Sequence, residues 1–189
     1  IGVRAICGLF GSASSTLVKT EITNTLQLGV MSQLRGIDST GLAIAGRPGN
    51  GKKQRHKYDV TITKDIIPSG YFLNTKQVGD AFKEVTIPSA ILGHCRAATI
   101  GEVNPMNAHP FECGDIVGVH NGTLNGELAS EARKLGITDS EMFYRELADT
   151  SLQKALDKCG LTSAYAFVWI DKQEHTLNML RNQRRPLYL

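Results

Sequence analysis

The chain has 189 residues, a length that suits one domain with a sizeable hydrophobic core. Its 41% of hydrophobic and 21% of charged residues are ordinary for a globular protein, and a net charge of +3 is too small to indicate nucleic-acid binding. No secretory signal and no apolar run of membrane-spanning length is visible. We therefore expect a cytoplasmic protein whose partners include neither nucleic acid nor a membrane.

The cysteines and glycines give no sign of a metal or a cofactor. No C-x-x-C pair occurs, and the five histidines do not combine with the cysteines in a metal-binding pattern. The glycine-rich turns lack the spacing of a dinucleotide site or a phosphate-binding loop. We expect no metal, no cofactor, and four reduced thiols, at Cys7, Cys95, Cys113 and Cys159.

The first half of the chain predicts short strands around one long helix. Residues 7–10 are typical of a buried strand, and Ser14 or Ser15 can cap a helix that runs to about Leu34. Residues 41–45 form the next predicted strand, and turn residues at 47–51 predict a hairpin partner over 54–63. A further strand is predicted over 91–94.

The second half adds a strand over 116–120, a helix over 124–135 that stops at Gly136, and a helix beginning at Asp139 or Ser140. Residues 164–170 and 175–180 predict a final hairpin, and 186–189 resemble an entering strand. Since the chain also lacks an initial methionine, we expect a fragment or a trimmed product. This order predicts an α/β sandwich of two helix-covered sheets rather than a parallel βαβ sheet.

Cys7 is the most informative residue, because removal of a short leader, residues 1–6, would make it the first residue of the chain. A thiol is a good nucleophile, but with a reference pKa of about 8.5 it is mostly protonated near neutral pH. An α-amine, with a reference pKa of roughly 7.7 to 8.0, can act as the base on the same residue. The pattern predicts an amide-cleaving nucleophile.

Other polar residues could complete such a site. The amide of Asn121 and the backbone N–H of Gly122 could donate to an oxyanion, Arg96 could bind a carboxylate through both arms, and Asp139 could bind an ammonium. Taken singly, each residue also has a plainer interpretation. These interpretations are a buried apolar thiol at Cys7, a hairpin turn at Asn121–Gly122, a surface ion pair at Arg96, a helix N-cap at Asp139 and a loop residue at His109.

Six ordered blocks resemble the class II glutamine amidotransferases, which carry an N-terminal-nucleophile hydrolase domain. The resemblance covers nearly the whole chain and implies a four-layer αββα sandwich of two mainly antiparallel sheets. The blocks are C-G-L-F-G at 7–11, R-G-I-D-S-T-G at 35–41, G-H-C-R-A-A-T at 93–99, N-A-H-P-F at 107–111, H-N-G at 120–122 and T-D-S-E at 138–141.

The resemblance implies hydrolysis of the glutamine side-chain amide to glutamate and ammonia, with residues 1–6 as leader and 7–189 as the amidotransferase domain. It assigns the nucleophile to Cys7 and the oxyanion hole to Asn121 and Gly122. The substrate-binding group would comprise Arg96 and Thr99 at the α-carboxylate, Asp139 at the α-ammonium, and His109 as a support, while Arg35 and Asp38 would support the site from behind.

Two departures from the family pattern, Ala97 in place of an aromatic residue and Ile100 in place of a polar one, could loosen the glutamine pocket. No acceptor domain follows residue 189, so the implied partner for ammonia is a separate acceptor enzyme or a missing C-terminal domain. Two alternatives stay open: hydrolysis of a different amide, and a noncatalytic or unprocessed binding protein that keeps the fold.

Overall fold

The computed structural model of the protein describes residues 7–48, 59–98 and 102–189. The predicted leader, the first part of the predicted hairpin strand over 54–63, Thr99 and Ile100 lie outside the described residues.

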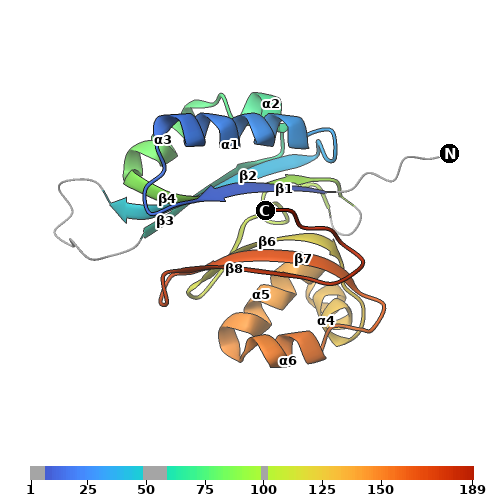
Figure 1. Cartoon of the computed structure of the whole chain (residues 1–189). Helices are drawn as coiled ribbons and strands as arrows, with labels where there is room; N and C mark the ends of the chain where they lie inside the picture. Colours follow the sequence, from blue (N-terminus) through green and yellow to red (C-terminus); the bar gives the residue numbers. More distant parts are fainter. Residues whose placement is uncertain (1–6, 49–58, 99–101) are drawn as a thin grey trace.

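Two four-stranded sheets stack face to face, and each carries helices on its outer face (Figure 1). The first sheet is antiparallel throughout. Its strands, in spatial order, are β1 (Gly8–Ala13), β4 (Val85–Arg96), β2 (Ser39–Pro48) and β3 (Asp59–Asp65). Its outer face is covered by α1 (Lys19–Ser32), α2 (Ser69–Phe72) and α3 (Lys76–Glu84).

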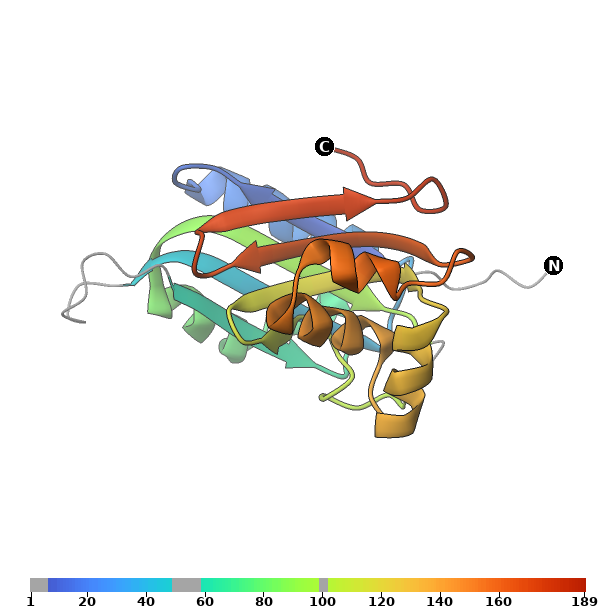
Figure 2. The same cartoon turned by 90° about the horizontal axis from the view of Figure 1, so that it is seen from below.

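The second sheet is antiparallel as well. It runs in the order β5 (Phe111–Cys113), β6 (Ile116–Thr123), β7 (Ala164–Asp171) and β8 (Thr176–Arg181). Its helices are α4 (Glu127–Leu135), α5 (Asp139–Asp149) and α6 (Leu152–Asp157), which lie below the strands in Figure 1 and in front of them in the view from below in Figure 2. The predicted αββα sandwich of two antiparallel sheets is confirmed.

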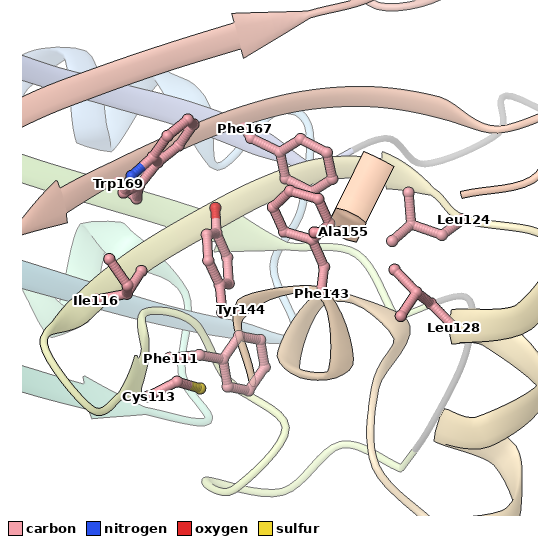
Figure 3. Close-up of a cluster of buried hydrophobic side chains, with 10 residues drawn as sticks. All are labelled: Phe111, Cys113, Ile116, Leu124, Leu128, Phe143, Tyr144, Ala155, Phe167 and Trp169. Carbon is pink, nitrogen blue, oxygen red and sulfur yellow. The ribbon is translucent and has the colours of Figure 1, made fainter. Parts of the chain in front are cut away.

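Strand alternation divides the core into layers. On β4, Ile91 packs with the outer helices, whereas Leu92 packs between the sheets with Val117 and Val119 of β6. The outer layer of the second sheet is aromatic, and Figure 3 shows Phe143 of α5 against Phe167 of β7. Their ring centroids lie 3.7 Å apart and the rings are stacked.

Two predicted helices begin later than the sequence suggested. The backbone N–H of Ser14 donates to Ser89 and that of Leu17 donates to Pro88, so this segment stays against β4 and α1 starts only at Lys19. The start of α4 is delayed because the N–H of Leu124 is held by Asp139 and Gly126 takes a left-handed φ of 82°. The predicted end of α4 at Gly136 is confirmed.

Some elements were not predicted. The helices α2, α3 and α6 and the three-residue strand β5 have no counterpart among the predictions, and three of the four are too short to give a periodic signal. Residues 186–189 form no strand in the structure, so that prediction is wrong. Leu187 instead packs its side chain against the apolar layer between the sheets.

Candidate active site

Cys7 lies beside the end of β4. Gly8 pairs with Cys95, and the Cys7 Sγ lies 3.4 Å from the backbone nitrogen and 3.5 Å from the carbonyl oxygen of Ala97. Leu9 packs between the sheets, so Cys7, two residues earlier, faces the same space by strand alternation. Arg96 shares this face with Leu92 for the same reason. Cys7 and Arg96 therefore lie together at one end of the space between the sheets.

The segment between α1 and β2 supports both residues. Arg35 Nε donates to the Cys7 carbonyl at 3.1 Å. Asp38 accepts from the backbone N–H of Ala98 at 2.7 Å, and its own N–H donates to the Arg96 carbonyl at 3.0 Å. At Gly36 a Cβ would overlap the Arg96 backbone, so this close approach requires glycine. Arg35 and Asp38 thus contact the backbone that carries the two predicted functional side chains.

Asn121 and Gly122 lie on β6, paired with Ala166 and Tyr165 of β7. The hairpin-turn interpretation is therefore wrong. Val117 and Val119 face the first sheet, and alternation points the Asn121 side chain the same way, toward the sheet that carries Cys7. Asn121 is 5% exposed, and its amide has no hydrogen-bond partner in the part of the chain that the structure describes. The amide is therefore available to donate to a ligand or to water.

Asp139 ties the first turn of α5 to the end of β6. One carboxylate oxygen accepts from the Leu124 N–H at 2.7 Å, and the other accepts from the Ser140 N–H at 2.9 Å. The N-cap of α5 is Thr138, which accepts from Glu141, so the interpretation of Asp139 as an N-cap is wrong. Asp139 is 8% exposed, and the oxygen that accepts from Leu124 can accept a second donor.

Arg96 is 4% exposed, which excludes a surface ion pair, and its Nη1 donates to the Glu102 carbonyl at 3.0 Å. Burial lowers the pKa of Arg96, while Cys7, Asp38 and Asp139 act to raise it. Burial raises the pKa of the Cys7 thiol; the Ala97 backbone and Arg96 oppose the rise and Asp139 adds to it. A thiol with a raised pKa is protonated at neutral pH, so it needs a base before it can attack.

No family model matches the chain. Similar proteins include glutamine–fructose-6-phosphate aminotransferases (isomerizing) of Vibrio parahaemolyticus, 27% identical over 97% of this chain, and Gluconobacter oxydans, 29% identical over 96%. The protein of the same name from Streptococcus mutans is 25% identical over 97% of the chain. The predicted resemblance to the class II glutamine amidotransferases is confirmed over nearly the whole chain. It spans about 30% of the length of the curated relatives it matches.

Two predicted substrate-binding residues remain, His109 and Thr99. His109 is 5% exposed and its ring lies 4.0 Å from that of His94 and 4.5 Å from that of Phe111, measured between centroids. Neither ring nitrogen has a hydrogen-bond partner among the described residues. This position, in the interior, favours support over contact with substrate. Thr99 lies outside the described residues, so its role stays a prediction.

Two contributors to this amidotransferase site were missed by the sequence analysis. Lys64 of β3 donates to the carbonyls of Ala108 and Pro110, at 2.7 and 3.1 Å, and thereby clamps the segment that carries His109. No motif surrounds Lys64, so only the fold could reveal it. His94 joins β4 to β6 through the His120 carbonyl, although the G-H-C-R block already contained this residue.

All four cysteines are free, as expected for reduced thiols. Within residues 7–48, 59–98 and 102–189, no cluster of three or more His, Cys, Asp or Glu side chains could hold a metal ion. In the same ranges no helix is long and apolar enough to cross a membrane.

Proposed function

We propose that this amidotransferase domain hydrolyses glutamine to glutamate and ammonia through a thioester on Cys7. The observation that carries the proposal is the convergence at one end of the sandwich. There a nucleophile, a buried cation and a buried carboxylate share one electrostatic environment, and an unpaired amide on the facing sheet points into the same space.

Arg96 and Asp139 support an α-amino acid as the substrate. The guanidinium can bind the α-carboxylate, and the Asp139 carboxylate can bind the α-ammonium while keeping its bonds to Leu124 and Ser140. Because both groups are buried, pairing each with an opposite charge of the substrate offsets the cost of their own burial. A simple amide offers neither of these two charges, which disfavours hydrolysis of a different amide.

The reaction needs one water and no other reactant. With residues 1–6 removed, the α-amine of Cys7 takes the thiol proton, and the thiolate attacks the side-chain amide carbon of glutamine. The Asn121 amide and the Gly122 N–H donate to the oxyanion that forms. The proton then passes to the leaving nitrogen, ammonia departs and a thioester remains. Water attacks the thioester, with the amine again as base, and releases glutamate and the thiol.

Arg35 and Asp38 hold the backbone that carries Cys7 and Arg96. Arg35 holds the Cys7 carbonyl, and Asp38 holds the backbone on both sides of Ala97. Residues 1–6 act as a leader and residues 7–189 as the catalytic domain in this proposal. As long as the leader is attached, Cys7 has an amide nitrogen in place of the amine and lacks its base.

The ammonia, in this proposal, is destined for an acceptor outside residues 7–189. The relatives are more than three times as long as this chain, and their name gives fructose 6-phosphate as the compound that receives the amino group. We propose a sugar phosphate as the acceptor, bound by a further domain or a partner enzyme in the cytoplasm.

The test is glutamate release from glutamine by protein whose intact mass shows Cys7 as the first residue. The wild type should release glutamate and ammonia in equal amounts, and Cys7→Ala should release neither while keeping its fold. Cys159→Ala is the matched control, because Cys159 is also a partly buried free thiol, and it should keep the activity. A wild type without glutamate release would favour the noncatalytic alternative. An active Cys7→Ala variant would exclude a thioester on Cys7 from the mechanism.

A further inference from the structure

A buried histidine on the first sheet holds the backbone next to Asn121. His94 Nε2 lies 3.0 Å from the carbonyl oxygen of His120, on β6 of the second sheet. A carbonyl can only accept, so Nε2 must carry the proton and donate it. His94 is 1% exposed and its ring is neutral, because burial lowers its pKa to about 3. The bond is therefore present over the whole range of pH in which the protein could work.

The carbonyl concerned belongs to the peptide unit that begins Asn121. A peptide unit is planar, so anchoring the His120 oxygen also fixes the direction of the Asn121 nitrogen and Cα. The sheet holds this segment from one side only, since β5 pairs with β6 no further than Gly118, whereas β7 pairs with it up to Thr123. Beyond Gly118, β6 therefore lacks a strand on one side, and side chains from other elements must fix its position there.

His120 is anchored on its other side by its ring. The ring nitrogen Nδ1 lies 2.8 Å from the Ser140 hydroxyl, next to Asp139, and the ring stacks on Phe167 at 4.5 Å between centroids. His94 is itself held, since its ring packs against that of His109, whose segment is clamped by Lys64. A continuous set of contacts thus runs from β3 through β4 to the residue before Asn121.

We propose that His94 is a positioning residue for the oxyanion hole: it fixes the His120–Asn121 peptide so that the Asn121 amide stays aimed at the substrate beside Cys7. This inference rests on the proposed hydrolysis of glutamine and adds a residue to its machinery. The Asn121 amide acts on the oxyanion rather than on the α-carboxylate or α-ammonium. Loss of His94 should therefore lower kcat and leave KM for glutamine nearly unchanged.

The experiment measures kcat and KM for glutamate release by protein with Cys7 first. His94→Leu removes the donor, and kcat should fall about 10²-fold, the cost of a misplacement of about 1 Å. His94→Gln keeps an N–H at a similar reach and should recover most of kcat. His94→Asn keeps polarity but is too short for the His120 carbonyl and should behave like His94→Leu. Leu92→Ala, on the same strand and face, is the control for lost packing and should keep kcat.

A double-mutant cycle shows whether His94 acts through Asn121. In an Asn121→Ala background, His94→Leu should cost little more, because both substitutions remove the same donor. Independent, multiplicative losses would overturn the inference, and so would wild-type kcat in a folded His94→Leu or His94→Asn variant. If His94→Leu does not fold, the comparison of His94→Gln with His94→Asn decides. Wild-type protein without glutamate release would refute the proposed function and this inference together.

Discussion

Replacement of Asn121 by alanine should separate catalysis from stability. In the resting protein the Asn121 amide, on a residue that is 5% exposed, makes no hydrogen bond to another described residue, so the truncation breaks none. The free energy of unfolding should change by less than about 1 kcal/mol, since the cost of orphaning a buried partner does not arise. In the proposed mechanism the same amide is one of two donors to the oxyanion of the transition state. Its loss should lower kcat by roughly 10² to 10³, or about 2.7 to 4 kcal/mol.

The two quantities are measured separately, kcat by glutamate release and stability by urea unfolding. Asn178→Ala on β8 is the control, because the Asn178 side chain bonds to the Thr176 hydroxyl on its own strand, away from the candidate site, and its loss should change neither quantity. An Asn121→Ala variant with wild-type kcat would exclude Asn121 from the oxyanion hole. If the free energy of unfolding fell by as much as the activation free energy rose, the residue would act through the fold.

Three further predictions concern the other groups of the site. Arg96→Lys should raise KM for glutamine strongly, because lysine offers a point charge in place of a two-armed donor; wild-type KM would refute the carboxylate assignment. Asp139→Asn should also raise KM, and because Asp139 adds to the raised pKa of Cys7, this variant should lower that pKa and speed alkylation of Cys7 by iodoacetamide at fixed pH. Slower alkylation would contradict the sign of this effect. Protein beginning at Cys7 should react with a glutamine-like electrophile far faster than protein that keeps residues 1–6, and equal labelling, with the leader confirmed by intact mass, would make the amine dispensable.

The blocks that identified the family are short and contiguous, so the sequence alone could assign them. Asn121 with Gly122, and Arg35 with Asp38, each lie within a few residues, so a short stretch of sequence is enough to recognise each pair. The antiparallel sandwich was also predictable, because strand and helix periods alternate in the order that such a fold requires. The capping glycine at Gly136 needed no tertiary information, since a left-handed residue ends a helix locally.

The elements that the sequence missed depend on contacts between distant segments. Ser14 and Ser15 are good helix caps by type, but backbone bonds to Ser89 and Pro88 keep that segment extended. Asp139 looked like a local cap, yet its carboxylate reaches back to Leu124 and leaves the cap to Thr138. In both places a long-range hydrogen bond overrides the local propensity, which is worth no more than such a bond.

The sequence by itself determined which chemical groups are present: a thiol near the start, an arginine, an aspartate and an asparagine followed by glycine. Only the tertiary structure decided that these groups share one space, since Cys7 and Arg96 come from one sheet and Asn121 from the other. It also decided the roles of Lys64 and His94, which depend on carbonyl oxygens of other segments. A side chain that bonds to a distant main-chain carbonyl leaves no residue-type pattern in the sequence, because every residue type supplies the same carbonyl.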